Sequence, residues 1–392
     1  MKIFRLRFLD NKTPIPILKG IEDSFIRKGY FGGATDFYKF YAQNIKYYDV
    51  NSLYPFAMLK PMPHKLVKFH KDLTNFKLDN FFGFCLAEVN CPKNMLRPIL
   101  PYKSKDNKTI FPTGKWIGVY FSEELKAVVK LGYNIQLING YEFTKEYIFK
   151  DYVEHFYESK KNSFGAERFI AKMHLNQLYG IFGRRLDLIE TINISADKLD
   201  DYLLGKVIKS VIEITDDIYA VLIHTNMRST ILEELNIHLE FERKNNFIPT
   251  VQSNVAIAAA VTSYARIHMI PFKLDSGIVY TDTDSIFTTN SLPFEEVGRE
   301  LGLMKDELTG NTIKEGYFLG IKKYGYYYID ENGNTITSSV FSGIERNSLT
   351  FEDVTNIADG GVITRNVPIR FNRHIKDLNI EIKPATVTVS YN

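Results

Sequence analysis

The chain has 392 residues and 45% of them are hydrophobic, which is enough for a large core and more than one subdomain. Its 49 basic and 46 acidic residues leave a formal net charge of only +3, so the total charge does not indicate nucleic-acid binding and local placement must decide. Cys85 and Cys91 are not spaced as a zinc motif or a disulfide framework, which favours a reducing compartment. No stretch reaches the length of a membrane helix, because the longest small-apolar run, 255–261, leads into Ser263 and Arg266, and we expect no membrane partner.

The first motif along the chain is a glycine-rich loop. Residues 3–9, which precede it, alternate basic and apolar side chains and are expected to form a short strand, without the apolar run of a secretory signal. The loop itself is Tyr30-Phe31-Gly32-Gly33. Glycine lets a backbone approach a ligand closely, but such loops are also ordinary turns, and for this loop alone the second interpretation is favoured.

An aspartate ends the next β-prone run. Asp49 follows an aromatic segment and precedes Asn51 and Ser52, and Pro55 then breaks the local structure. An aspartate at a strand end suits a metal ligand, and it equally suits a helix cap or a turn. Residues 60–149 hold short strand-like pieces and one helix start, and they show no evident chemistry.

A helical hairpin is predicted for residues 150–185. Its second arm covers about 166–182, where Arg168, Lys172 and Asn176 recur every four residues on one face. A cationic stripe is usually a solvated face, but compact positive charges at this spacing also suit a triphosphate.

The pair of aspartates in residues 279–287 is the strongest local signal. Strand-like flanks surround Asp282 and Asp284, and strand side chains two apart share a face. Two close carboxylates repel each other unless a cation lies between them, and Mg²⁺ prefers oxygen ligands. We therefore interpret the hairpin, which follows a small-residue helix at 254–270, as half of a metal site, with Asp49 as the third carboxylate. A surface turn is the more common setting for such a pair taken alone.

An aromatic strand pair covers residues 316–328. It is interrupted by two lysines, of which Lys322 lies two residues before Tyr324. Lysine beside tyrosine can hold a phosphate and stack on a base or sugar, but lysines also guard edge strands, and the two interpretations weigh equally for this segment alone. Residues 331–392 are mixed, with a helix predicted near 351–358.

These groups together describe nucleotidyl transfer to a growing strand. Carboxylates that hold two divalent cations stabilise both the attacking and the leaving oxygen at phosphorus. Cationic helix residues neutralise a triphosphate, and an aromatic residue beside the metal site can test the sugar.

Five segments resemble, in order, the motifs of family B DNA polymerases. Residues 49–55, DVNSLYP, resemble motif A (D-x-x-S-L-Y-P), and residues 172–180, KMHLNQLYG, resemble motif B (K-x-x-x-N-S-x-Y-G). Residues 280–285, YTDTDS, resemble motif C (Y-x-D-T-D-S), while residues 322–324 fit K-x-Y and residues 30–33 fit Y-x-G-G. Each motif alone is weak, but five in the family's order are specific.

The spacing is most similar to the protein-primed branch of bacteriophages and linear mitochondrial plasmids. That branch carries insertions between motifs A and B and between motifs B and C, and the resemblance implies that the first contacts a terminal protein and the second encircles DNA. It also implies a right-hand α+β fold with an antiparallel-sheet palm, helical-hairpin fingers and a small thumb. The expected segments are 1–59 (N-terminal segment and first palm strands), 60–149 (first insertion), 150–185 (fingers), 186–250 (second insertion), 251–330 (palm) and 331–392 (thumb).

The resemblance assigns roles residue by residue. Asp49, Asp282 and Asp284 are expected to be catalytic and to hold two Mg²⁺ ions, or Mn²⁺, with the carbonyl of Val50 as a further ligand. The residues expected to contact the incoming dNTP are Leu53, Tyr54, Lys160, Arg168, Lys172, Asn176 and Tyr179, of which Tyr54 would exclude a ribose 2′-hydroxyl. The residues expected to contact the DNA template-primer are Tyr30, Gly32, Gly33, Lys322 and Tyr324.

Two features depart from the family pattern. Gln177 stands where motif B has serine, which puts its template contact in question. Met1 lies only a short way before the Y-x-G-G motif, so we expect a polymerase without the 3′–5′ exonuclease domain. A role in DNA replication in the mitochondrion, from an organelle or plasmid gene, follows from the family likeness and from a composition typical of AT-rich genomes.

Two other functions are compatible with the sequence. Gln177 and the expected lack of the exonuclease half favour a chain that keeps the fold and only binds DNA or terminal protein. The intact Asp49, Asp282, Asp284 and Lys172 disfavour it. An RNA polymerase or a reverse transcriptase also uses palm aspartates, and Tyr54 as a sugar gate disfavours ribonucleotides. Primer extension with Mg²⁺, and a comparison of dNTP with NTP incorporation, distinguish the three.

Overall fold

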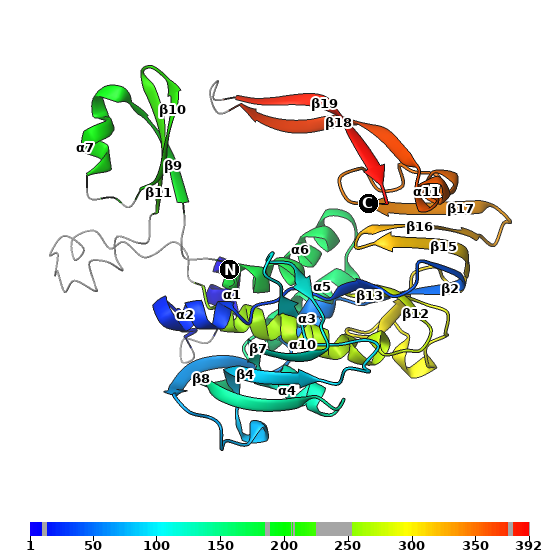
Figure 1. Ribbon diagram of the computed structural model, residues 1–392, viewed down its shortest axis with the longest axis horizontal. Helices are drawn as coiled ribbons and strands as arrows, with labels where there is room; N and C mark the ends of the chain where they lie inside the picture. Colours follow the sequence, from blue (N-terminus) through cyan, green and yellow to red (C-terminus); the bar gives the residue numbers. More distant parts are fainter. Residues whose placement is uncertain are drawn as a thin grey trace. The chain divides into compact units, whose positions relative to one another are not determined.

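The computed structural model describes residues 1–9, 14–184, 189–204, 206, 208–224, 253–374 and 379–391. They belong to two compact units. The larger unit comprises residues 1–183, 254–364 and 388–392, and the smaller comprises residues 184–253 and 365–387. Helices and antiparallel sheets are combined in one chain, as expected for an α+β fold (Figure 1).

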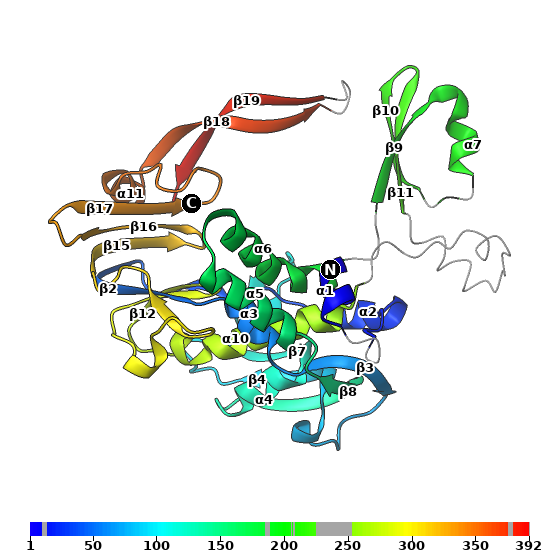
Figure 2. The ribbon, with the colours of Figure 1, turned by 180° about the vertical axis from the view of Figure 1, so that it is seen from behind.

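The larger unit is built on an antiparallel sheet, which is seen from behind in Figure 2. Its strands are β1 (Thr35–Phe37), β2 (Tyr41–Val50), β12 (Ile278–Asp282), β13 (Ser285–Thr288), β15 (Ile313–Gly320), β16 (Lys323–Ile329) and β17 (Thr335–Phe341). They lie in the order β1-β12-β13-β2-β15-β16-β17, and β14 (Met304–Asp306) also pairs with β2. The sheet therefore continues past residue 330, where the sequence placed the end of the palm.

Strand β2 holds the sheet together. Its end pairs with β13 on one side and β14 on the other, and its beginning pairs with β15. Rings from β2, β13 and β15 pack together, with Tyr47 stacked on Phe287 at 4.2 Å and Phe318 against Phe287 at 5.2 Å between ring centroids. This aromatic packing makes the strand ends that carry Asp49 and Asp282 a rigid platform.

Helix α10 (Val255–Lys273) is the core helix of the unit. Asn254 caps it by accepting from the N–H groups of Ala256 and Ile257, and its small side chains let it lie between the first-insertion sheet and helices α3 and α6 (Figures 1 and 2). The expectation that no stretch is long enough to span a membrane was wrong, because the apolar run continues beyond Arg266 and reaches a mean hydropathy of 1.3. Its most apolar window is 72% buried inside the protein, as in the core helix of a globular domain.

Residues 60–149 form a sheet of their own. Its strands are β3 (Met62–His70), β4 (Gly83–Cys91), β7 (Gly114–Phe121) and β8 (Asn134–Glu146), in the order β3-β8-β4-β7. Helix α4 (Ser122–Val129) covers the sheet, and the short strands β5 (Tyr102–Lys103) and β6 (Thr109–Ile110) form a separate hairpin. The 3₁₀ turn η1 (Leu78–Asn80) contacts α4.

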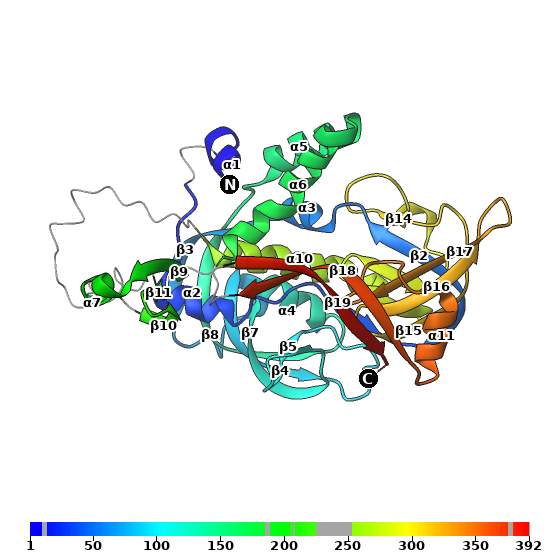
Figure 3. The same ribbon diagram turned by 90° about the horizontal axis from the view of Figure 1, so that it is seen from above.

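The predicted helical hairpin is confirmed as α5 (Lys150–Asn162) and α6 (Gly165–Phe182), which lie side by side in Figure 3. The expected strand at residues 3–9 is instead helix α1 (Lys2–Arg7). Alternation misled the prediction, because only Phe4 of this helix is buried, and its ring packs against Phe149, Tyr152 and Phe182. Helices α2 (Gly20–Arg27) and α3 (Leu53–Met58) complete this side of the unit.

The C-terminal helix prediction is confirmed as α11 (Phe351–Ala358), which starts with a capping box between Thr350 and Asp353. The 3₁₀ turn η3 (Phe294–Glu296) lies in the loop after β13. Strands β18 (Val362–His374) and β19 (Asn379–Ser390) pair as a long ribbon.

The smaller unit contains a three-stranded sheet. Strands β9 (Ile189–Ser195), β10 (Ile208–Thr215) and β11 (Ile218–His224) lie in the order β10-β11-β9, with η2 (Ala196–Lys198) and α7 (Leu199–Leu203) between β9 and β10. Strands β10 and β11 pair as an antiparallel hairpin within the expected second insertion. The rest of the expected second insertion, 225–250, lies outside the described residues.

Candidate active site

The turn between β12 and β13 presents the two aspartates of the hairpin. Asp282 is paired with Ser285 in the sheet, and Thr283 has a left-handed backbone, with φ of 64°. The N–H of Thr283 donates to the carbonyl of Ala34 at 2.9 Å. A Cβ at Gly33 would lie 2.4 Å from Cγ2 of Thr283, so only glycine permits this close approach of loop and turn.

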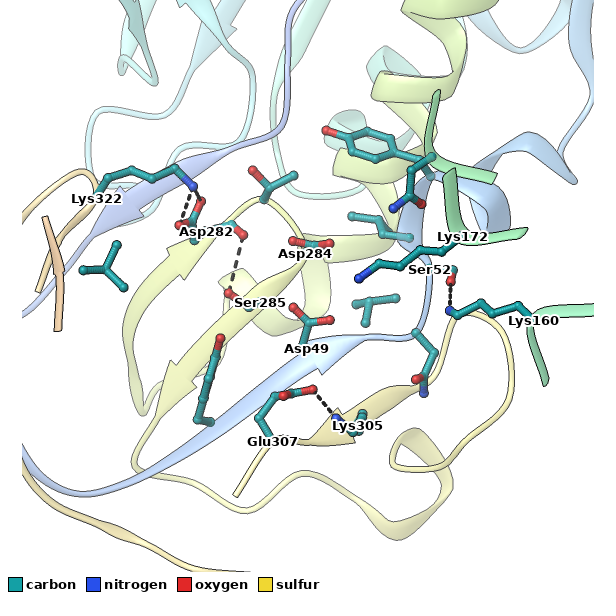
Figure 4. A pocket seen from close by; sticks show the side chains of 18 of the residues that line it. Asp49, Ser52, Lys160, Lys172, Asp282, Asp284, Ser285, Lys305, Glu307 and Lys322 are labelled. Atoms are coloured by element: carbon teal, nitrogen blue, oxygen red, sulfur yellow. Dashed lines mark hydrogen bonds and ion pairs between the residues drawn. The ribbon is translucent and has the colours of Figure 1, made fainter. Parts of the chain in front are cut away.

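Asp49 lies beside this turn. It is paired with Ser285 across the sheet, and the N–H of the next residue, Val50, donates to the carbonyl of Asp284 at 2.7 Å. Figure 4 shows the carboxylates of Asp49 and Asp284 facing the same space, with the Lys172 side chain reaching toward them. The register between β2 and β13 thereby brings together Asp49 and Asp284, which lie 235 positions apart in the sequence.

Burial and repulsion from neighbouring carboxylates disfavour ionisation of the Asp49 and Asp284 carboxyl groups. Burial, together with the charges of Asp284 and Glu307, raises the pKa of Asp49 to about 7, against the opposing effects of Lys305 and Lys172. Burial likewise raises the pKa of Asp284, with a contribution from Asp282. When two carboxyl groups are buried close together, ionisation of each one costs free energy. A bound cation offsets that cost, so such a pair favours cation binding.

Asp282 has a different environment. Its Oδ1 and Oδ2 accept from the Lys322 ammonium at 2.5 Å and 2.6 Å, and Oδ1 also accepts from the Thr35 hydroxyl at 3.2 Å. Lys322 lies in the tight turn between β15 and β16 with φ of 56°, and its N–H donates to the Tyr280 hydroxyl. The structure thus brings Asp282 to the site, where its carboxylate forms an ion pair with Lys322. Within the described part of the chain, no lysine forms such an ion pair with Asp49 or Asp284.

The donor set fits a hard divalent cation. Among the residues that the structure describes, no three His, Cys, Asp or Glu side chains gather closely enough to hold an ion by themselves. Asp49 and Asp284 nevertheless provide carboxylate oxygens as metal ligands, and their negative charges repel each other in a largely buried place. Val50, whose carbonyl was expected to be a further ligand, lines the same cavity. Mg²⁺ typically binds to one or two carboxylates and completes its shell with water and substrate phosphates, so this pair is sufficient for it.

The cavity in front of the aspartates has a volume of about 800 Å³ and is bounded on one side by the helical hairpin. Lys160 donates to the Ser52 hydroxyl at 2.8 Å, and its carbonyl accepts from Arg168 at 2.8 Å. Burial lowers the pKa of Lys160, and the neighbouring charges of Arg168 and Lys172 lower it further. Three cations are thus crowded at one wall, where an anion would relieve their repulsion.

Two tyrosines line the same cavity as these three cations. The Tyr54 ring from α3 stacks on the Tyr179 ring from α6, with 4.4 Å between centroids. Burial raises the pKa of Tyr54, so its hydroxyl is neutral at physiological pH. Gln177, the departure from motif B, is exposed and contacts Met173, and it is not among the residues that line the cavity.

Most of the predicted site residues line this one cavity. Only Tyr30, Gly32 and Gly33 do not, and they lie in the loop that supports the β12–β13 turn. The prediction missed Lys305 of β14 and Glu307, which directly follows that strand; both line the cavity and are joined by a 2.7 Å ion pair. That strand is three residues long and has no motif, so only its pairing beside Asp49 reveals it. The lining residues that the prediction includes are Asp49, Val50, Leu53, Tyr54, Lys160, Arg168, Lys172, Asn176, Tyr179, Asp282, Asp284, Lys322 and Tyr324.

Comparison with known proteins identifies the family. Residues 1–276 match the family described as DNA polymerase type B, organellar and viral, and the chain belongs to this family. A probable DNA polymerase of Podospora anserina is 36% identical over 373 residues, which is 90% of this chain and 30% of that protein. The DNA polymerase of Bacillus phage Nf is 27% identical over 77% of this chain and 49% of its own length. The chain therefore spans about a third to a half of the curated relatives that it matches.

The fold has a solved counterpart. Phi29 DNA polymerase, in complex with primer-template DNA and incoming nucleotide substrates, superimposes with a TM-score of 0.72 at 18% sequence identity. The match covers 100% of this chain and 66% of that one. The α+β polymerase architecture expected from the sequence is thereby confirmed.

Proposed function

We propose that this chain carries out DNA-templated DNA synthesis, as a nucleotidyltransferase that adds dNTPs to a 3′-hydroxyl or to a protein hydroxyl. The observation that carries the proposal is that the Asp49 and Asp284 side chains face one cavity, which the cations of the helical hairpin also line. Carboxylates on one wall and cations on the other match a metal–triphosphate complex, whose charges alternate in the same way.

Each wall has a part in the reaction. Two Mg²⁺ ions held by Asp49 and Asp284 would supply Lewis-acid stabilisation to the attacking and leaving oxygens. Lys160, Arg168 and Lys172 bind the triphosphate and orient it for in-line attack. Tyr54 closes the space beside the sugar, so that a 2′-hydroxyl would be excluded.

The primer side of the cavity carries the last groups. Lys322 neutralises Asp282 when no strand is bound, and with Tyr324 it holds the end of the primer strand. Asn176 and Tyr179 pack against the new base pair, while Tyr30, Gly32 and Gly33 guide the template.

The partners follow from the relatives. The Phi29 polymerase structure contains primer-template DNA and nucleotides, and we propose that this chain binds both. The family description as organellar and viral supports protein priming, with residues 60–149 as the contact for a terminal protein, and a mitochondrial location.

Primer extension with Mg²⁺ and dNTPs tests the proposal. Asp284→Asn is expected to abolish incorporation and to leave DNA binding within about threefold, since metal chemistry rather than template affinity is lost. The exposed substitution Asp106→Asn serves as the control. Retained synthesis by Asp284→Asn removes the metal assignment, and a wild-type chain that binds DNA without extending it indicates a binding remnant.

Sugar selection distinguishes the DNA polymerase from an RNA polymerase. Wild-type protein is expected to prefer dNTPs, and Tyr54→Val is expected to increase NTP incorporation because the space beside the 2′ position opens. Equal use of both sugars by the wild type would contradict the assignment.

A further inference from the structure

A buried ion pair joins the core helix to the first insertion. Arg266 of α10 donates from Nε and Nη2 to both carboxylate oxygens of Glu124 of α4, at 2.6 Å and 2.7 Å. Both side chains are almost fully buried, with 2% and 1% exposed. Nη2 also donates to the hydroxyl of Ser263, one turn earlier on the same helix.

The remaining guanidinium nitrogen reaches the glycine-rich loop. Nη1 of Arg266 donates to the carbonyls of Phe31 and Gly32 at 2.9 Å and 2.7 Å. The Phe31 side chain is itself buried in the core of the first insertion, where it stacks on Tyr120 with 5.9 Å between centroids. Arg266 and Phe31 thus anchor the loop to α10 and to the first insertion.

The loop in turn holds the aspartate turn. Gly33 lies against the Thr283 side chain, and the next carbonyl, of Ala34, accepts the N–H of Thr283 at 2.9 Å. Thr35 is paired with Asp282 in the sheet and donates its hydroxyl to that carboxylate. Three consecutive residues, the last two of the loop and the first of β1, therefore contact the turn that carries both aspartates.

Stability alone does not account for the pair. A buried ion pair loses the hydration of two charges, and apolar residues of the same volume often serve the fold equally well. Apolar residues cannot replace the guanidinium group of Arg266, which donates to two loop carbonyls while it remains paired with the Glu124 carboxylate.

We propose that Arg266 is a positioning residue, which sets the place of Asp282 and Asp284 through the loop of residues 31–35, and that Glu124 couples the first insertion to this placement. The inference about catalysis rests on the proposed function, whereas the structural coupling does not. A partner that binds the first insertion and displaces Glu124 would therefore change the position of the aspartate turn through Arg266 and the loop.

The experiment compares Arg266→Lys with the wild-type full chain. Lysine keeps the positive charge opposite Glu124, so the fold is expected to persist. It cannot donate to both loop carbonyls, so the contact with the loop is weakened. Amide hydrogen exchange of residues 279–287 is expected to be faster by about tenfold, because the bond between Thr283 and Ala34 opens more often. In primer extension, kcat is expected to fall about tenfold to a hundredfold, with the KM for dNTP nearly unchanged because the cationic wall is intact.

The matched control is Leu125→Ala, which removes a fully buried core side chain next to Glu124 and leaves the ion pair in place. It is expected to lower thermal stability at least as much as Arg266→Lys, without faster exchange at residues 279–287. Glu124→Gln is expected to resemble Arg266→Lys in exchange and in kcat.

Unchanged exchange of residues 279–287 in both Arg266→Lys and Glu124→Gln, or equal acceleration in Leu125→Ala, overturns the inference. If the wild type does not extend a primer, the proposed function fails by itself, and the exchange measurement still decides whether Arg266 positions the turn.

Discussion

The raised pKa of Asp49 leads to a test of the site that does not depend on activity. Burial and neighbouring carboxylates raise this pKa from 3.8 to about 7, so ionisation of Asp49 opposes folding. The cost is absent below the unfolded pKa, grows between pH 4 and pH 7, and is complete above the folded pKa. Asp49→Asn removes it, and the metal-free variant should therefore be more stable than the wild type at pH 8 and equally stable at pH 4.

The magnitude follows from the shift. At about 1.4 kcal/mol for each pKa unit, a shift of about three units corresponds to about 4 kcal/mol. Asp49 is only partly buried and Lys172 and Lys305 lie nearby, so we expect about half of this value, about 2 kcal/mol, after allowance for solvent screening. For a unit of roughly 300 residues this raises Tm by about 3 °C.

Differential scanning fluorimetry in EDTA measures the effect at both pH values, with Asp106→Asn in an exposed loop as the control. Added Mg²⁺ should then stabilise the wild type at pH 8 and not the variant, because a ligand stabilises only the state that binds it. A lower Tm for Asp49→Asn at pH 8 in EDTA, or the same gain at pH 4, would refute the electrostatic argument.

Two further substitutions test the packing around the site. Gly33→Ala places a Cβ against Thr283 and is expected to slow primer extension by about tenfold or more, whereas the exposed substitution Asp106→Asn should leave the rate nearly unchanged. Equal rates for the two variants would show that the close contact is not required. Phe4→Ala removes a fully buried ring at the base of the helical hairpin and should cost about 3–5 kcal/mol of stability in urea unfolding, compared with less than about 0.5 kcal/mol for Leu6→Ala on the exposed side of the same helix. A small loss for Phe4→Ala would mean that α1 is not anchored there.

Local periodicity predicted the parts of the fold that depend on local order. The hairpin helices, the small-residue helix before the aspartates and the capped helix at 351–358 all have helical spacing or capping residues that act within a few positions. The convergence of Asp49 with Asp284 was predictable only because both lie at strand ends within recognisable motifs. Their geometry then follows from one register between β2 and β13.

Long-range pairing accounts for what was missed. Glu307 and Lys305 are brought to the site by the short strand β14, whose three residues carry no periodic pattern. Arg266 interrupts an apolar helix, and without its partner Glu124, 142 residues away, it resembles an exposed charge. The N-terminal helix was predicted as a strand because a six-residue segment with one buried side chain fits either period.

The central claim is that Asp49 and Asp284 share one divalent cation site. Mn²⁺ binding, followed by electron paramagnetic resonance on the metal-free protein, measures this directly for the wild type, Asp49→Asn, Asp284→Asn and the double variant. We predict that each single substitution weakens Mn²⁺ binding by about tenfold or more. The two losses should not be additive, so the double variant is expected to bind Mn²⁺ more tightly than the product of the two single losses gives. Wild-type affinity in either single variant, or two independent and fully additive losses, would contradict a shared site.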